Sequence, residues 1–219
     1  MFLIPSSIES GRPALIEGAT GTVLTYGDLG DRVAERAAEL ACAERRLAFC
    51  FTRNDVASIV TYLAVIEAGH AVFLLDSTTA LDFVAHLLDR YRPEWVLHPP
   101  DGHQVVLRER GYEPIDSQAG AASWSLKSPE SQPMASDLAL LLSTSGTTGS
   151  PKLVRLSAKN VASNALSIVN SLGIDERERA VTSLPISYSY GLSVLNSHLA
   201  AGATIVTTDE SVLTPAFWG

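Results

Sequence analysis

The feature that most constrains the fold is the alternation of short apolar runs with longer segments of helical periodicity. The runs "RLAFCF" (46–51), "AVFLLD" (71–76) and "EWVLH" (94–98) have the length of strands and are apolar at most positions. Helix-length segments with one apolar stripe lie between them. Strands that are apolar on both faces and separated by helices are typical of βαβ units with a parallel sheet. The sequence therefore predicts an α/β fold with mostly parallel sheets flanked by helices.

Helix boundaries are marked by side chains that can accept hydrogen bonds from a first helical turn. The expected caps are Thr25 paired with Asp28, Asn54, Thr79 paired with Asp82, and Ser157. The helix after Thr25 carries an apolar stripe of Leu29, Val33, Ala37 and Leu40. Gly69 and Gly202 are expected to end two helices, since glycine adopts positive φ without steric cost.

The amino-acid composition changes in the middle of the chain. Residues 113–137 are rich in Pro, Ser, Gly, Gln and Ala, and within them only "ASWSLK" (122–127) resembles a strand. We expect a first α/β lobe over residues 1–112, a linker or surface crossing over 113–137, and a second α/β lobe over 138–219. In the second lobe, strand patterns at 138–143, 152–157, 179–186 and 203–208 alternate with helical patterns.

Composition excludes several classes of protein. The 219 residues are 46% hydrophobic and 18% charged, as in ordinary globular proteins. A net charge of -8 argues against nucleic acid and anionic membrane as partners, because both bind basic surfaces. The opening "MFLIPSSIES" lacks the basic start of a signal peptide, and the apolar stretch 56–68 is too short to span a bilayer. We expect a cytoplasmic protein.

Neither cysteine nor histidine spacing indicates a metal site. Cys42 and Cys50 form no CxxC or CxxH motif, and Cys50 lies in an apolar run, which favours core packing. The histidines His70, His86, His98, His103 and His198 are scattered without ligand spacing, so we expect them to pack in the core or on the surface.

One stretch, "STSGTTGSPK" (143–152), has the residue types of an anion-binding loop. Gly146 and Gly149 allow the backbone to turn several N–H groups toward one point. Ser and Thr hydroxyls add donors, and Lys152 adds a positive charge that can follow a phosphate. The alternative interpretation is a solvent-exposed loop. The P-loop of kinases and GTPases does not fit, because no Gly-Lys is present and a strand pattern follows in place of a helix.

The same stretch resembles the phosphate-binding signature of the adenylate-forming superfamily, which includes acyl-CoA synthetases, luciferases and nonribosomal peptide adenylation domains. Further stretches resemble that superfamily in the same order, namely "LTYGDL" (24–29), "LAVIEAGHAVFLLD" (63–76) and "LPISYSYGLSVLNSHLAAGATIV" (184–206). The resemblance covers nearly the whole chain. It implies the front part of a large N-terminal AMP-binding domain.

The resemblance also implies a reaction and a site. A carboxylate would attack the α-phosphate of ATP, pyrophosphate would leave, and the acyl-adenylate would react with a thiol, either CoA or a carrier protein. The residues implied to hold the phosphates are Ser145, Gly146, Thr147, Thr148, Gly149 and Lys152. Thr144 is implied to contact Mg²⁺ as well, and Tyr188 would stand beside the reacting carboxylate. For Tyr188 and Tyr190 the alternative is simple packing.

Departures from the superfamily pattern bear on the substrate. Leu153 stands where glycine is usual and Ala158 where many members have histidine, but both follow the loop. Ser189 stands where amino-acid-activating members carry an aspartate for the substrate amine. A carboxylic acid without an α-amine is therefore favoured.

Several motifs of the superfamily are not found in these residues, including those for adenine, ribose and the catalytic lysine of a C-terminal domain. Thr214 and Pro215 in "VLTPAFWG" (212–219) resemble the start of a helix. We therefore expect an ATP-dependent acid ligase of which this is the front part, inactive alone. Faces left open by truncation would favour self-association. The alternative is a non-catalytic nucleotide-binding or scaffolding protein.

Overall fold

The computed structural model describes residues 2–98, 100–115, 122–129, 133–143, 153–210 and 212–218. Its strands are β1 (Pro13–Glu17), β2 (Val23–Thr25), β3 (Leu47–Thr52), β4 (Ala71–Asp76), β5 (Trp95–Leu97), β6 (Tyr112–Ile115), β7 (Ser123–Leu126), β8 (Leu138–Ser143), β9 (Leu153–Ser157), β10 (Arg179–Val181) and β11 (Thr204–Thr207). Its helices are α1 (Tyr26–Glu39), α2 (Val56–Glu67), α3 (Leu81–Tyr91), α4 (Gln104–Glu109), α5 (Ala158–Leu172), α6 (Ser189–Ala201) and α7 (Pro215–Trp218).

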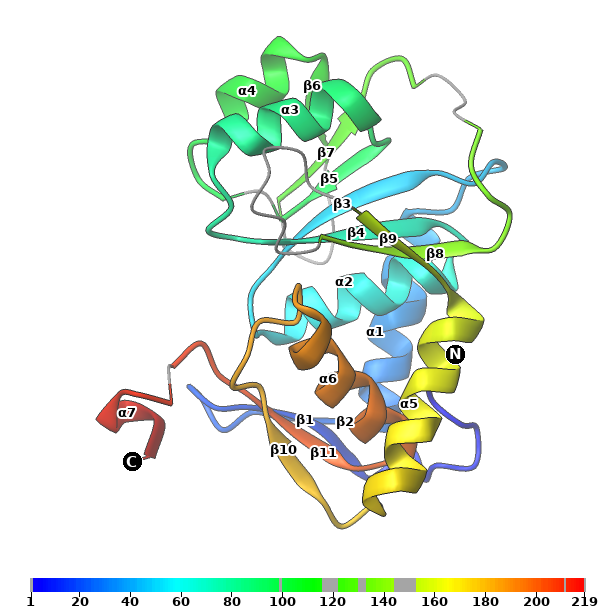
Figure 1. Cartoon of the computed structure of the whole chain (residues 1–219), viewed down its shortest axis with the longest axis vertical. Coiled ribbons are helices and arrows are strands. Elements are labelled where there is room, and N and C mark those ends of the chain that lie inside the picture. The colour runs from blue at the N-terminus through cyan, green and yellow to red at the C-terminus, as the bar shows by residue number, and fades with distance from the viewer. Residues whose placement is uncertain are drawn as a thin grey trace.

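Two sheets and two helical layers stack on one another (Figure 1). The larger sheet has the strand order β6-β7-β5-β3-β4-β8-β9, and the smaller has the order β10-β11-β1-β2. Helices α1, α2, α5 and α6 lie between the two sheets, whereas α3 and α4 cover the other face of the larger sheet. The predicted α/β class with sheets flanked by helices is confirmed, and both sheets are mixed: five of the strand pairs described are parallel and four are antiparallel.

The core follows from the apolar strands. In β3, Ala48 and Cys50 face the helices between the sheets, and Phe49 and Phe51 face the layer of α3. The larger sheet is therefore buried on both faces, as the continuous apolar runs predict. Cys50 is a buried free thiol whose pKa burial raises to about 12, so it acts as a small apolar residue.

Both sheets take strands from the segments before and after residues 113–137. In the smaller sheet, β1 pairs with β11 in parallel, and in the larger sheet β4 pairs with β8 in parallel. Segments 112–115 and 123–126 form β6 and β7 of the larger sheet. The sheets thus do not follow the sequence division into residues 1–112 and 138–219, and that division stays a prediction.

The predicted capping box of Thr25 with Asp28 and the predicted cap Ser157 are both present. The side chain of Thr25 accepts a hydrogen bond from the Asp28 N–H, and the Asp28 carboxylate accepts one from the Thr25 backbone N–H. Ser157 and Asn160 make the same pair at the start of α5. Gly69 and Gly202 follow α2 and α6 with φ of 83° and 74°.

Two other predicted caps are wrong. The N-cap of α2 is Asp55, which accepts from Ser58 N at 2.7 Å, and Asn54 is turned to other partners. The N-cap of α3 is Ala80 without a side-chain bond, because the Thr79 hydroxyl donates to the Asp76 carbonyl at 2.6 Å. In both places a tertiary or turn contact competes with the cap for a short polar side chain.

Among the described residues, no helix combines the length and apolar character needed to cross a bilayer.

Candidate functional site

The carboxyl ends of the parallel strands form one edge of the larger sheet. Strands β3, β4, β5 and β8 run in the same direction, so the chain leaves all four at this edge. The chain continues from β3 into α2 on one face and from β4 into α3 on the opposite face. Where successive connections diverge to opposite faces of an open α/β sheet, a crevice opens that commonly binds ligands.

The smaller sheet converges on the same edge. Asn54, just after β3, donates from Nδ2 to the carbonyl of Thr182, just after β10, at 2.9 Å. The Asn54 backbone N–H donates to Asp209 Oδ1, two residues after β11, at 3.0 Å. The loops that follow β3, β10 and β11 are therefore joined, which brings the carboxyl ends of both sheets together.

The predicted phosphate loop connects two strands at this edge. Strand β8 ends at Ser143 and β9 begins at Leu153, and these two residues are paired in an antiparallel register. Helix α5 begins only at Ala158, so the prediction that a strand follows the loop is confirmed. The predicted phosphate residues Thr144, Ser145, Gly146, Thr147, Thr148, Gly149 and Lys152 all lie outside the described residues.

Tyr188 is the predicted site residue that the structure describes. It is the N-cap residue of α6, its N–H donates to the Pro185 carbonyl at 3.0 Å, and its side chain makes no capping bond. Tyr188 is 52% exposed and Tyr190 is 63% exposed, so neither ring is buried in the core. Tyr188 thus stands at the start of α6, two residues after Ile186, whose N–H donates to Asn54 Oδ1.

Gly191 permits a close approach between α6 and the segment before it. A Cβ atom at this position would lie 2.4 Å from the Pro185 carbonyl oxygen and 2.6 Å from that of Leu184. Both obstacles are backbone atoms, so the first turn of α6 packs on the 184–185 backbone only because residue 191 has no side chain.

One buried histidine lies near this edge. His98 follows β5, and its Nε2 lies 2.7 Å from Thr61 Oγ1. Burial, followed by the charge of Arg36, lowers the pKa of His98 to about 4, so this imidazole is neutral at pH 7. Within the described ranges, no three His, Cys, Asp or Glu side chains lie together as a metal site.

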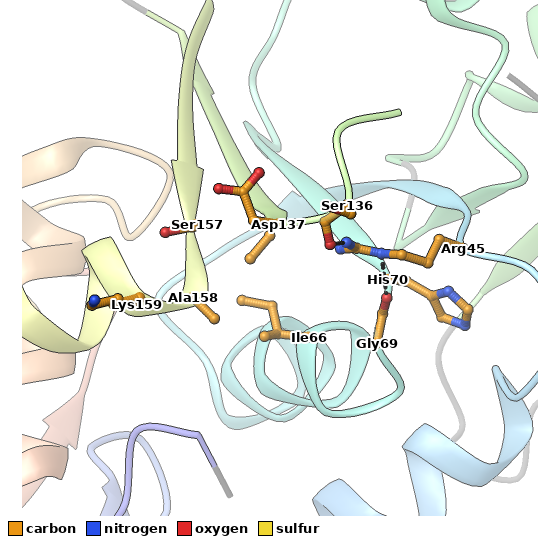
Figure 2. Close-up of a pocket in the computed structure, with 10 residues that line it drawn as sticks. Arg45, Ile66, Gly69, His70, Ser136, Asp137, Ser157, Ala158 and Lys159 are labelled. Atoms are coloured by element: carbon orange, nitrogen blue, oxygen red, sulfur yellow. Dashed lines mark hydrogen bonds between the residues drawn. The ribbon is translucent and has the colours of Figure 1, made fainter. Parts of the chain in front are cut away.

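A separate pocket of about 530 Å³ lies at the opposite edge, between the end of α2, the entry to β8 and the start of α5 (Figure 2). Arg45 spans it: Nε donates to the Gly69 carbonyl at 2.8 Å, and the other guanidinium nitrogens donate to the carbonyls of Ser136 and Leu138. Because each of the three nitrogens donates to a backbone carbonyl, Arg45 ties the end of α2 to β8.

Sequence reasoning missed the joining role of Asn54 and its partner Asp209. The sequence predicts Asn54 as a helix cap, but the neighbouring Asp55, which is an equally good capping residue, takes that role. The partners of Asn54 lie more than a hundred residues away along the chain, so no local sequence pattern predicts them.

Comparison with known proteins agrees with this geometry. The AMP-binding enzyme family matches residues 7–219. A D-alanine–D-alanyl carrier protein ligase of Streptococcus pneumoniae is 29% identical over 210 residues, which are 88% of this chain and 38% of the ligase. A feruloyl-CoA synthase of an Amycolatopsis species is 27% identical over 192 residues, or 85% of this chain and 39% of the synthase.

The crystal structure of apo MatB from Rhodopseudomonas palustris has the same fold. The TM-score is 0.77 at 24% identity, and the match covers 95% of this chain and 44% of MatB. This chain therefore spans less than half the length of these relatives. With the family matched over almost all of its length, the chain belongs to the AMP-binding enzymes.

Proposed function

We propose that this chain is the front part of an AMP-forming, ATP-dependent ligase that activates a carboxylic acid and transfers it to a thiol. The observation that carries the proposal is the position of Ser143 and Leu153, the residues on either side of 144–152. They end β8 and begin β9 at the edge where the loops after β3, β10 and β11 meet. A family relative named as a CoA synthase and another named as a carrier protein ligase support the same class of reaction.

In the proposed reaction, a carboxylate oxygen attacks the α-phosphorus of ATP, and the bond to pyrophosphate breaks. The thiol then attacks the acyl carbonyl, and AMP leaves. The negative charge on the departing pyrophosphate needs nearby donors and cations. Lys152 would supply a cation, residues 145–149 would supply N–H and hydroxyl donors, and Thr144 would contact the Mg²⁺ that accompanies ATP.

Tyr188 would stand beside the reacting carboxylate, and its exposed ring at the start of α6 is open to a small molecule. Ser189 in place of an acidic residue leaves no partner for a substrate amine at this position. We therefore favour an acid without an α-amine, with CoA as the acceptor. A carrier protein is the alternative acceptor.

The test is acid-dependent exchange of pyrophosphate into ATP, measured on the protein made from its whole reading frame. A panel of acetate, malonate, benzoate, ferulate and D-alanine covers the acid classes. We expect Lys152→Ala to slow the exchange by about 10²- to 10³-fold, since removal of one charge-stabilising donor costs that much in related chemistry. Lys159→Ala removes an exposed lysine seven residues along and is the matched control.

Exchange that survives Lys152→Ala unchanged would refute the phosphate assignment. If no acid supports exchange and the protein still binds ATP with an affinity that depends on Lys152, the alternative of a non-catalytic nucleotide-binding protein gains support. Equal loss in Lys159→Ala would point to a general effect of surface charge.

A further inference from the structure

Asn54 connects three loops through one short side chain and its own backbone. Its Nδ2 donates to the Thr182 carbonyl at 2.9 Å, and its Oδ1 accepts from the Ile186 N–H at 3.3 Å. Its backbone N–H donates to Asp209 Oδ1 at 3.0 Å. The carboxamide thus bonds both ends of the 182–186 segment and closes it against the end of β3.

The segment that Asn54 holds leads directly into Tyr188. The Tyr188 N–H donates back to Pro185 at 3.0 Å, and Gly191 packs against the carbonyls of Leu184 and Pro185. The position of the segment therefore determines where α6 begins and where the Tyr188 ring stands.

Asn54 is not needed to start α2. Asp55 caps that helix, and the Arg53 N–H is satisfied by Ser58 Oγ at 3.0 Å. Position 54 instead needs a side chain that donates to Thr182 and accepts from Ile186 at the same time. The short carboxamide of asparagine carries both a donor and an acceptor on one planar group. Aspartate has the same shape but loses the donor to Thr182 and places a negative charge against a carbonyl oxygen.

We infer that Asn54 is a positioning residue for the acid-binding side of the site, acting through the 182–188 segment on Tyr188. The inference rests on the proposed function, in which Tyr188 stands beside the carboxylate. ATP is assigned to the connection between β8 and β9, which Asn54 does not contact in the described residues. Loss of the Asn54 bonds should therefore weaken binding of the carboxylic acid and leave binding of ATP unchanged.

The experiment compares Asn54→Asp and Asn54→Ala with the wild-type protein. We expect the KM for the best acid of the panel to rise about tenfold, which corresponds to the loss of about one buried hydrogen bond, while the KM for ATP stays within twofold. Asn164→Asp is the matched control, since the Asn164 side chain also joins two elements, donating from α5 to Ser193 Oγ of α6 at 3.4 Å, outside residues 182–188.

Amide hydrogen exchange supplies a readout that does not depend on activity. In the Asn54 variants, the amides of Ile186 and Tyr188 should exchange at least tenfold faster, while that of Val60 in α2 keeps its wild-type rate. If Asn54→Ala does not fold, the test uses Asn54→Asp alone, because aspartate has nearly the same volume as asparagine.

The outcomes separate the two proposals. A rise in both KM values, unchanged KM values, or equal acceleration of Ile186 and Val60 exchange would overturn the positioning role. If the wild type shows no acid-dependent exchange, the proposed function fails, and the Ile186 and Tyr188 amides still decide whether Asn54 holds the segment.

Discussion

Replacing Gly191 with alanine tests the close approach of α6 to the segment before it. The added Cβ would lie 2.4 Å and 2.6 Å from two carbonyl oxygens and 2.9 Å from the Pro185 carbonyl carbon. All three atoms are backbone, so no side-chain rotation can relieve the overlap, and either α6 or the 184–185 segment must shift.

The expected magnitude combines two opposed terms. Overpacking in a tightly packed region costs about 1–3 kcal/mol, and three backbone contacts place this site in the upper half of that range. Alanine gains about 1 kcal/mol over glycine in a helix. The net expectation is a loss of about 1–2 kcal/mol in the free energy of unfolding, or about 0.5 M in the urea midpoint at a slope of about 3 kcal/mol/M.

Gly30→Ala is the matched control. Gly30 lies within α1, has ordinary helical φ, and a Cβ there would meet no atom within 4 Å. The same substitution should stabilise the protein by up to about 1 kcal/mol at this position. Urea unfolding followed by far-UV circular dichroism measures both variants. A Gly191→Ala protein as stable as the wild type would refute the argued contact.

Two further predictions concern the helix caps and the buried histidine His98. Thr25→Ala removes one half of a capping box and should lower the free energy of unfolding by about 1 kcal/mol; Ser157→Ala should do the same at α5, and unchanged urea midpoints would contradict both. His98 has its pKa lowered to about 4 by burial and then by Arg36, so the unfolded chain binds its proton first as pH falls. Stability from this group is complete above about pH 6.5 and is lost between about 6.5 and 4, by about 3 kcal/mol in total. His98→Asn, which tolerates the φ of 54°, should flatten this part of the pH profile, and an identical slope would contradict the assignment.

Those parts of the fold that depend on neighbouring residues could be predicted from the sequence. Thr25 with Asp28 and Ser157 with Asn160 are three residues apart, so the capping geometry is encoded within one turn. The apolar runs of β3 and β4 are likewise recognisable, because burial on both faces demands apolar residues throughout.

The assembly of the sheets could not be predicted in the same way. Strand β1 pairs with β11, whose residues are about 190 positions later, and β2 has only three residues. Strands this short carry little periodicity, and their stability comes from partners that a local pattern does not contain. Helix α4 was not predicted for the same reason, because its six residues are too few to show a helical period.

Asn54 shows where local reasoning reaches its limit at the site itself. Asn54 and Asp55 are adjacent, both cap helices well, and either could precede Val56. The choice is made by charge and by distant partners: an aspartate accepts from the α2 N–H groups at the positive end of the helix, whereas an amide can also donate to the Thr182 carbonyl. Exchanging the two residues, Asn54→Asp with Asp55→Asn, would therefore preserve a capping side chain at α2 and still release the 182–186 segment. That double variant should unfold in urea near the wild-type midpoint while the Ile186 amide exchanges faster, and a protected Ile186 amide would show that the bond from residue 54 to the Thr182 carbonyl is not what holds the segment.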